Sequence, residues 1–302
     1  TFTGDAEAIC RANINLRTAE RVLIEVGRFR ATTFEELFQG IKSLDWENYI
    51  PVDGKFWVTK ATSVKSKLFS LTDIQSIAKK AMVERMKSHY DIQWFDEDGS
   101  DYPVRIFLMN DNVIVTLDST GTPLHKRGYR TYTSKAPLSE TMAAALIQLT
   151  PWHPDRILVD PFCGSGTFLI EAALMAAHIA PGLNREFTSM DWNNLIPQKL
   201  WRECFDEARA EVDTSVECDL QGYDIDPEMV KIARLNAKQA GVDHMIHFQQ
   251  RDVADLSHPK KYGFILTNPP YGERLEDKRD LPAIYGKLGA AFKKLETWSM
   301  IS

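Results

Sequence analysis

The segment Tyr262-Gly263-Phe264-Ile265-Leu266-Thr267-Asn268-Pro269-Pro270-Tyr271 joins an apolar run to an Asn, two prolines and a Tyr. The run predicts a buried strand, and the prolines end it in a rigid loop because they have a fixed φ and no backbone N–H. In an open α/β sheet, ligands bind where such a strand ends. The Asn oxygen and the loop carbonyls can accept hydrogen bonds from the exocyclic amine of a planar ring, while the Tyr side chain stacks on the face of that ring. The predicted catalytic residues are Asn268, Pro269, Pro270 and Tyr271.

A second motif lies upstream, between a strand expected over 156–160 and a helix expected over 168–180. Its glycines would let the backbone approach a ligand closely, and the start of the helix adds free N–H donors. The dinucleotide fingerprint needs a third glycine at position 169, where this chain has Leu169. The loop therefore indicates a small cofactor with a carboxylate end rather than a pyrophosphate.

Acidic residues follow the next two expected strands, 221–224 and 245–249. Asp226 reads as a helix N-cap, which leaves Asp224 at its strand end as an acceptor for two ribose hydroxyls, and Asp252 could accept from an adenine amine. A single such carboxylate is as often a cap or a solvated charge, but polar side chains at four successive strand ends indicate a ligand site. The expected cofactor-binding residues are Asp160, Pro161, Phe162, Cys163, Gly164, Ser165, Gly166, Thr167, Asp224, Ile225, Asp252, Val253 and Asn268.

This order of motifs resembles the class I S-adenosylmethionine-dependent methyltransferases, in the branch that modifies exocyclic amines. The strings Asp-Pro-Phe-Cys-Gly-Ser-Gly-Thr from Asp160 and Asn-Pro-Pro-Tyr-Gly-Glu-Arg-Leu from Asn268 are similar to those of THUMP-containing RNA methyltransferases, and especially of the bacterial 23S ribosomal RNA guanine-N2-methyltransferases. The resemblance covers nearly the whole chain, including 4–22, 33–37, 127–130 and 136–138. It implies S-adenosyl-L-methionine as cofactor, RNA, specifically ribosomal RNA, as partner, and guanine N2 as target.

The expected fold is α/β, because strands and helices alternate through the second half of the 302-residue chain. The resemblance implies a Rossmann-like class I methyltransferase domain with a doubly wound sheet, whose C-terminal strands are missing, preceded by an α+β THUMP-type RNA-binding domain. The expected sections are 1–30, the remainder of an N-terminal ferredoxin-like α+β unit, 31–120, a THUMP-like domain of αβαββ order, 121–137, a linker, and 138–302, the methyltransferase domain.

The net charge of −6 argues against a nucleic-acid partner, but residues 55–90 hold eight Lys or Arg against two acids. RNA binding needs a basic face rather than a basic protein, although lysines on a helix more often just form a solvated surface. The resemblance favours binding. The predicted RNA contacts are Lys65, Lys67, Lys79, Arg127 and Arg130.

Composition bounds the remaining possibilities. No apolar run approaches ~18 residues, so we expect no membrane span. The four cysteines form neither CxxC pairs nor a His-linked zinc pattern, which predicts no metal and suits the reducing cytoplasm. Oligomeric state cannot be read from the sequence. The alternatives are an amino-methyltransferase acting on transfer RNA, DNA or protein and, more distantly, a non-catalytic RNA-binding protein or a sugar-nucleotide or nicotinamide enzyme.

Overall fold

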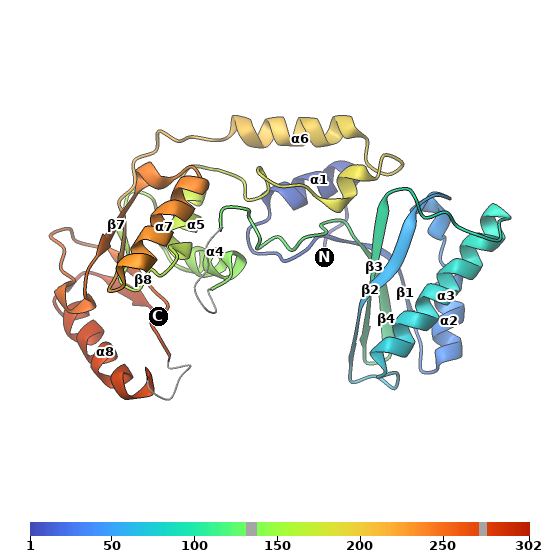
Figure 1. Ribbon diagram of the computed structural model, residues 1–302, viewed down its shortest axis with the longest axis horizontal. Coiled ribbons are helices and arrows are strands. Elements are labelled where there is room, and N and C mark those ends of the chain that lie inside the picture. The colour runs from blue at the N-terminus through green and yellow to red at the C-terminus, as the bar shows by residue number, and fades with distance from the viewer. Residues whose placement is uncertain (131–137, 272–276) are drawn as a thin grey trace. The chain divides into compact units, whose positions relative to one another are not determined.

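The computed structural model describes residues 1–130, 138–271 and 277–302, which form two compact units (Figure 1). The first, here the α+β unit, contains Thr1–Asn13, Arg21–Pro123 and Glu186–Phe205. The second, here the α/β unit, contains Ile14–Glu20, Leu124–Arg185 and Asp206–Ser302. The helix α1 (Ala6–Asn15) is shared between these segments.

The α+β unit is built on a four-stranded sheet of order β1-β4-β3-β2. Its strands are β1 (Leu23–Arg30), β2 (Lys55–Val64), β3 (Asp101–Met109) and β4 (Asn112–Asp118). Strand β2 runs parallel to β3, whereas β4 is antiparallel to both of its neighbours. Two helices, α2 (Phe34–Lys42) and α3 (Leu71–Tyr90), cover one face of the sheet (Figure 1). The observed order α2-β2-α3-β3-β4 confirms the expected αβαββ pattern.

Local sequence explains where α2 begins. Thr33 accepts a hydrogen bond from the Glu36 backbone N–H, and the Glu36 carboxylate in turn accepts from the Thr33 N–H. This capping box satisfies two of the donors that an α-helix leaves free at its start. The buried residues Leu37 and Ile41 then bring the apolar face of the helix onto the sheet.

Two segments of the α+β unit lie outside the section expected for it. Strand β1 lies entirely before residue 31, yet it pairs with β4 from Leu23 to Arg30 in the same sheet. Trp192 was expected in the methyltransferase section, but its ring stacks on Tyr102 at 5.0 Å and its Nε1 donates to the Asp101 carbonyl at 2.7 Å. These contacts join residues that are far apart in the chain, so they leave no local pattern in the sequence.

The α/β unit holds five strands in the order β7-β6-β5-β8-β9, and all of its strand pairs are parallel. The strands are β5 (Leu158–Asp160), β6 (Leu220–Asp224), β7 (Ile246–Gln250), β8 (Phe264–Leu266) and β9 (Ser299–Ile301). The helices are α4 (Glu140–Leu149), α5 (Thr167–Ala176), α6 (Gln198–Ala210, which begins in the α+β unit), α7 (Pro227–Gln239) and α8 (Asp277–Phe292).

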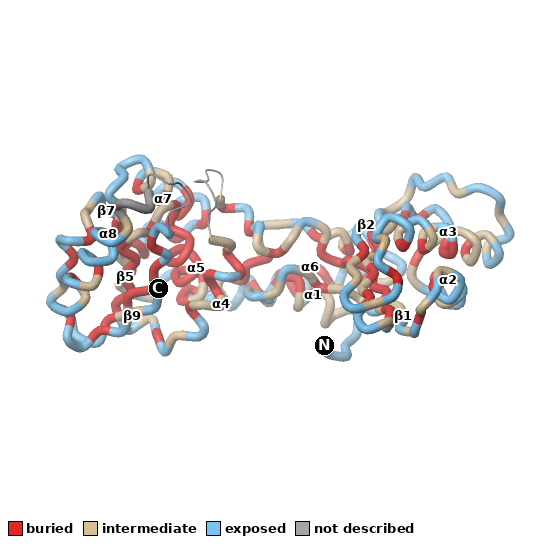
Figure 2. The backbone as a smooth tube through the Cα atoms, turned by 90° about the horizontal axis from the view of Figure 1, so that it is seen from below, coloured by how far each residue is buried: buried red, intermediate tan, exposed pale blue. Residues whose placement is uncertain are grey.

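Separate hydrophobic cores cover the two faces of this sheet, as a doubly wound fold requires. One core joins side chains of α4, α5 and α7 to the sheet, and the other packs Ala291 of α8 and Trp298 against Val159 and Ile265. Helix α5 is buried over almost its entire length (Figure 2). The expected doubly wound α/β sheet is confirmed. None of the helices in the described ranges is long and apolar enough to span a bilayer.

Candidate active site

The chain reverses its direction of winding between β5 and β8, which are neighbours at the centre of the α/β sheet. Because all five strands are parallel, their carboxyl ends lie at one edge, and such a switch point is where open α/β sheets bind ligands. Asp160 ends β5, Asp224 ends β6, and Thr267 and Asn268 follow β8 directly. The structure therefore brings together at one edge the strand ends that the sequence singled out.

Asp160 links the two motifs. Its Oδ1 accepts hydrogen bonds from the Thr267 hydroxyl at 2.6 Å and from the Phe162 backbone N–H at 3.1 Å. The side chain is 2% exposed, and this burial raises the pKa of the carboxyl to about 7, although both hydrogen bonds act to lower it. Sequence reasoning missed Thr267, whose position at the end of a strand directly before Asn268 was the available signal.

The two glycines of the upstream loop serve different purposes. Gly164 has a φ of +49°, and a Cβ added to it would meet no atom within 4 Å, so its backbone borders open space. Gly166 has a φ of +86° and begins α5, where an added Cβ would lie 3.0 Å from Phe248 and 3.1 Å from Ala233. Gly164 therefore leaves room for a ligand close to the backbone, whereas Gly166 allows close packing of helix and sheet.

Cys163, in the loop between β5 and α5, is buried, and its backbone N–H donates to the Tyr223 carbonyl at 2.9 Å. Burial raises the pKa of its thiol well above the ordinary value, so the thiolate needed of a nucleophile is disfavoured. This environment agrees with the interpretation of Cys163 as a small packing residue.

Asp224 is more engaged than the sequence indicated. One carboxylate oxygen accepts the Gly164 N–H at 3.0 Å, and the other accepts the Asp226 N–H at 2.9 Å. A carboxylate oxygen has more than one acceptor site, so the half-buried side chain can still accept from a ligand. Asp226 caps α7 through the Glu228 N–H, with Pro227 at the first helical position, as predicted.

Asp252 likewise has partners at both oxygens. It caps the 3-10 turn Val253–Asp255 by accepting the Ala254 N–H at 2.8 Å, and Lys287 of α8 approaches its other oxygen at 2.7 Å. The ion pair is 28–48% exposed, so it is weak and a ligand amine would have to share the carboxylate with Lys287. No local pattern in the sequence indicates that this lysine lies beside Asp252.

The loop of residues 268–271 after β8, here the Asn268 corner, presents Asn268 to the surface. Asn268 is exposed, Pro269 is buried, and Tyr271 is 59% exposed. Among the described residues, none forms a hydrogen bond with the Asn268 side-chain amide, while the Tyr285 hydroxyl donates to the Pro270 carbonyl at 3.3 Å. The remainder of the motif, 272–275, lies outside the described residues, as does 131–137 of the expected linker.

Of the two arginines predicted to contact RNA, Arg127 is buried and Arg130 is partly buried. The Arg127 side chain is 2% exposed, pairs with the fully buried Glu171 at 3.5 Å and donates to backbone carbonyls. Arg130 is 11% exposed and donates to the Thr167 hydroxyl at 2.6 Å, so it supports the start of α5. Each guanidinium donates to buried acceptors rather than pointing to solvent, and the two RNA contacts stay predictions.

The three predicted lysines differ among themselves. Lys79 donates to the Phe56 carbonyl, pairs with Glu97 at 2.9 Å and lies 3.8 Å from the Phe56 ring centroid, so its charge is directed toward the protein. Lys65 and Lys67 are exposed on the loop after β2. Only these two of the five predicted residues remain well placed for a phosphate.

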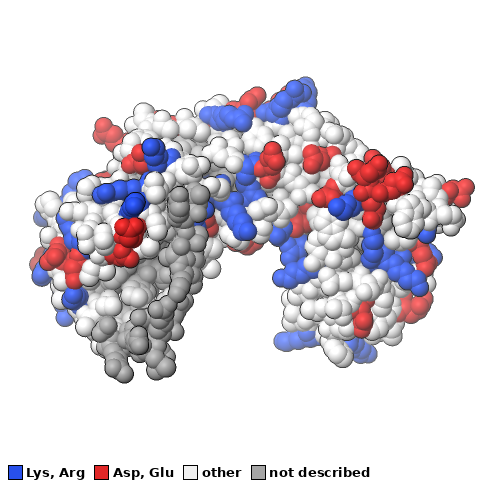
Figure 3. All heavy atoms as spheres, in the orientation of Figure 1, with Lys and Arg blue, Asp and Glu red and all other residues white. Residues whose placement is uncertain are grey.

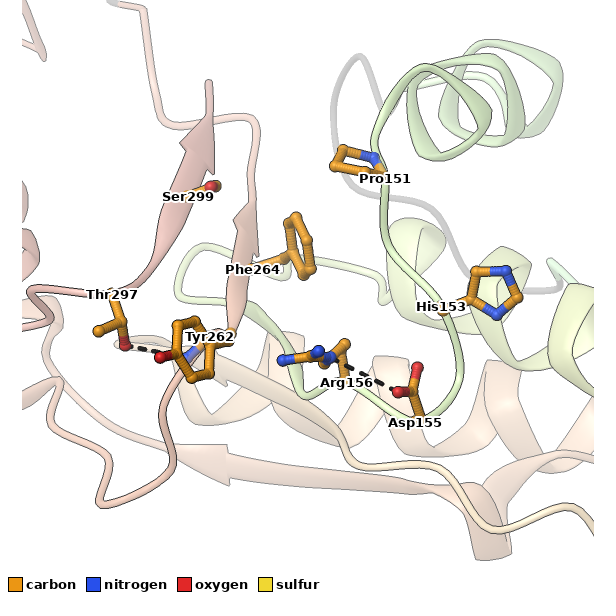
Figure 4. Close-up of a pocket in the computed structure, with 9 residues that line it drawn as sticks. Pro151, His153, Asp155, Arg156, Tyr262, Phe264, Thr297 and Ser299 are labelled. Atoms are coloured by element: carbon orange, nitrogen blue, oxygen red, sulfur yellow. Dashed lines mark hydrogen bonds and ion pairs between the residues drawn. The ribbon is translucent and has the colours of Figure 1, made fainter.

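A cavity of about 540 Å³ lies at the opposite edge of the sheet, where β8 and β9 begin (Figure 4). The Arg156 guanidinium lies 5.5 Å from the Tyr262 ring centroid, and the Tyr262 N–H donates to Thr297 Oγ1 at 2.9 Å. None of the predicted site residues lines this cavity. Within the described ranges, no cluster of three or more His, Cys, Asp or Glu side chains could hold a metal ion.

Comparison with known families matches three parts of the chain. Residues 127–301 match the model described as "RMKL-like, methyltransferase domain", residues 31–118 match the THUMP domain, and residues 1–23 match the RlmL ferredoxin-like domain. The first match alone spans more than half of the chain.

Individual relatives support the same family assignment. The chain is 49% identical over 305 residues to "Putative RNA methyltransferase YpsC" of Bacillus subtilis (strain 168), covering 99% of this chain and 78% of that protein. A Listeria monocytogenes structure described as a "predicted N6-adenine-specific DNA methylase" is 46% identical, with a TM-score of 0.93, over 98% of this chain and 78% of the other. SMU.472, crystallised in complex with SAH, is 43% identical with a TM-score of 0.92 over the same shares. This chain therefore belongs to the RMKL-like methyltransferase family and carries a THUMP domain.

Proposed function

We propose that this protein transfers a methyl group from S-adenosylmethionine to the exocyclic N2 of a guanine in RNA, with 23S ribosomal RNA as the substrate. One observation carries the proposal. The exposed Asn268 corner follows β8 at the switch point, and the Thr267–Asp160 hydrogen bond ties it to the start of the glycine loop on β5. An acceptor for an amine and a loop suited to a small cofactor are thus held together by a buried contact.

The cofactor is S-adenosyl-L-methionine, whose sulfonium supplies an electrophilic methyl group. The open space beside Gly164 fits a ligand that approaches the backbone closely, and Asp224, next to it through the Gly164 N–H, offers acceptors for ribose hydroxyls. The exposed Ile225 and the Asp252–Val253 turn follow the adjacent strands and would border the adenine. SAH in the related SMU.472 supports the same assignment.

The residues of the corner act on the target amine. Guanine N2 is a weak nucleophile because its lone pair is delocalised into the ring. Hydrogen bonds from the amine to the Asn268 side-chain oxygen and the Pro269 carbonyl would localise and aim that lone pair, and they stabilise the positive charge that develops on nitrogen. Holding the amine in line with the methyl group can supply roughly 7–11 kcal/mol of the barrier reduction.

The exposed Tyr271 ring supports base extrusion. A target amine inside a helix cannot reach the corner, so the base must leave its stack. The ring is 59% exposed and follows the rigid prolines directly, and stacking on it would contribute about 1–3 kcal/mol. The two prolines keep this ring and the Asn268 amide in a fixed relation.

RNA is the expected partner because the chain carries a THUMP domain and because its relative is described as "Putative RNA methyltransferase YpsC". Figure 3 shows basic and acidic side chains interspersed on the drawn face of the α+β unit, so binding would depend on local sites such as the exposed Lys65 and Lys67. All four cysteines are free thiols, which supports the expected cytoplasmic location because disulfides are rare there.

A second candidate is methylation of the exocyclic amine of adenine in DNA. The Asn268 corner would serve either amine, and the Listeria relative is described as an adenine-specific DNA methylase. Transfer RNA is a third possible substrate. The THUMP match favours RNA over DNA.

A tritiated-methyl transfer assay separates these candidates. The purified protein is incubated with labelled cofactor and with unmodified ribosomal RNA, transfer RNA, DNA or protein. We expect label in ribosomal RNA, recovered after digestion as N2-methylguanosine. Label in methyladenine from DNA, or in transfer RNA alone, would contradict the proposed substrate while leaving the methyltransferase assignment intact.

A further inference from the structure

A cavity of about 480 Å³ lies within the α+β unit, beside strands β2, β3 and β4. The buried core side chains Phe56, Val104, Ile106 and Leu117 belong to the helix-covered face. Side chains alternate across a strand, so Trp57, Pro103 and Arg105 lie on the other face, and all three line the cavity. This open face therefore carries a hollow that the helices do not fill.

A β-bulge places a second cation beside Arg105. The pairing of β2 with β3 shifts between Val58 and Lys60, so that Trp57 is opposite Pro103 and Lys60 is opposite Arg105. If the side chains alternated regularly from Val58 with Thr59 paired in the ladder, Lys60 would point to the core face. Bulges re-aim side chains in this way and are frequent near functional sites. Two like charges directly opposite each other on neighbouring strands destabilise a sheet. An anion bound beside Lys60 and Arg105 would relieve this repulsion.

The acids around the cavity do not neutralise this charge. The buried Asp118 accepts from Arg21 and lies 3.5 Å from Arg105, so one carboxylate faces two guanidinium groups. Asp101 lies 3.6 Å from Lys55, which compensates it. Lys60 is exposed, and no described residue pairs with its ammonium group. One guanidinium charge and the Lys60 charge are therefore in excess.

Arg105 also has an unused donor. Its side chain is 14% exposed, and its Nε–H is buried without a hydrogen-bond partner among the described residues. Such a group is costly to leave unsatisfied unless a ligand completes it. Beside the two cations, the half-buried Trp57 ring and Pro103 form an apolar surface one register step away.

We propose that this hollow binds a nucleotide of a single-stranded RNA segment, with its base on Trp57 and its phosphate on Lys60 and Arg105. This inference rests on RNA being the partner, as proposed above. The chemistry is an aromatic platform beside paired cations on an open sheet face, which is how single strands are bound by other four-stranded sheets. A double helix would keep its base faces stacked and could not use Trp57. The site would thus hold an unpaired segment of the substrate on the α+β unit.

Fluorescence anisotropy with a labelled single-stranded oligoadenylate of about 12 nucleotides tests the site. Trp57→Leu should weaken binding by about 5- to 150-fold through lost stacking. Lys60→Gln should weaken binding and reduce the slope of log affinity against log salt by about 0.7, the value for one phosphate contact. Lys80→Gln is the matched control, because it removes one exposed charge from α3 on the helix-covered side. It should leave the affinity close to that of wild type.

Several outcomes would overturn the assignment. If wild type binds the oligonucleotide and both site variants bind equally well, the hollow is not an RNA site. Equilibrium dialysis with adenosine monophosphate adds an independent arm: loss of that binding in Trp57→Leu with unchanged RNA affinity would identify a free-nucleotide site instead. If wild type binds no RNA at all, the proposed partner itself fails. Calorimetric titration with S-adenosylmethionine and thermal unfolding should be unchanged in each variant, which excludes misfolding as the cause.

Discussion

Asp160 is a buried acid whose ionisation should govern part of the pH dependence of folding. Its folded pKa of about 7 lies above the ordinary 3.8 because burial disfavours the carboxylate. A raised acid pKa means that its contribution to stability is fully present below about pH 4 and is lost as the pH rises toward 7. Relative to Asp160→Asn, the unfolding free energy of wild type should therefore fall by on the order of 4 kcal/mol across this window.

Urea unfolding at a series of pH values measures this difference. The Thr267→Val variant provides a matched test, because it removes the hydroxyl that stabilises the ionised form of Asp160. The Asp160 carboxyl of this folded variant should therefore be less ionised at any given pH. A difference between wild type and Asp160→Asn that does not change with pH would show that Asp160 is ionised in the folded protein.

Asp224 and Asp226 are neighbouring acids with separate assignments. Asp224→Ala removes the acceptor proposed for the ribose and the partner of the Gly164 N–H, so S-adenosylmethionine should bind about 10- to 100-fold more weakly. Asp226→Ala removes only the cap of α7, which should cost about 1 kcal/mol of stability and leave affinity unchanged. Calorimetric titration of both variants is the measurement, and equal affinities would move the ribose contact elsewhere.

The loop between β5 and α5 and the neighbouring strand β6 each hold a glycine, and substitutions of the two can be compared. Gly164→Ala places a methyl group in the open space assigned to the cofactor, at a positive φ that costs roughly 1–2 kcal/mol. Gly222→Ala on β6 would place a Cβ 2.5 Å from Phe248 and 2.7 Å from Leu169, which should cost about 1–3 kcal/mol by overpacking.

The two variants should therefore separate binding from folding. Gly164→Ala is expected to reduce cofactor affinity by more than its modest effect on stability explains, whereas folded Gly222→Ala should keep its affinity. Thermal unfolding and titration of the same preparations decide this. If Gly164→Ala binds the cofactor as wild type does, the cofactor does not lie against this loop.

Most elements could be predicted because they are short-range features. The apolar runs that contain β5 and β8 and the capped start of α7 are written in consecutive residues. Helix α6 was missed although Trp201, Cys204, Phe205 and Ala208 are buried at helical spacing, a signal that was available. The pairing of β1 with β4 could not be predicted, because strands that are distant in the chain leave no local pattern in the sequence.

The site shows the same division. Residues at strand ends could be placed, since parallel strands bring their carboxyl ends together. The Thr267–Asp160 hydrogen bond and the Lys287–Asp252 pair could not, because each joins residues far apart in sequence. The burial of Arg127 was likewise hidden, since a basic residue in a segment without acids looks the same whether it meets RNA or Glu171.

For the molecule as a whole, exposed and buried basic residues should behave differently toward RNA. The double variant Lys65→Glu/Lys67→Glu should lower RNA affinity and flatten its salt dependence while leaving stability unchanged, since both side chains are exposed. Arg127→Gln should instead cost on the order of 3 kcal/mol of stability, because the buried Glu171 would lose its ion pair and keep the hydrogen bond from the Tyr129 hydroxyl. Filter binding over a salt series together with thermal unfolding distinguishes them. An unchanged salt slope in the double variant would remove the loop after β2 from the RNA path.

Asn268 is central to the proposed mechanism, because it is the group that orients the target amine. The decisive measurement is single-turnover formation of N2-methylguanosine in unmodified ribosomal RNA, detected by mass spectrometry, for wild type and Asn268→Ala at saturating cofactor. The account predicts that wild type forms this nucleoside and that the variant forms it about 10²- to 10³-fold more slowly, with cofactor affinity retained. An equal rate in the variant, or a methylated product other than N2-methylguanosine, would contradict it.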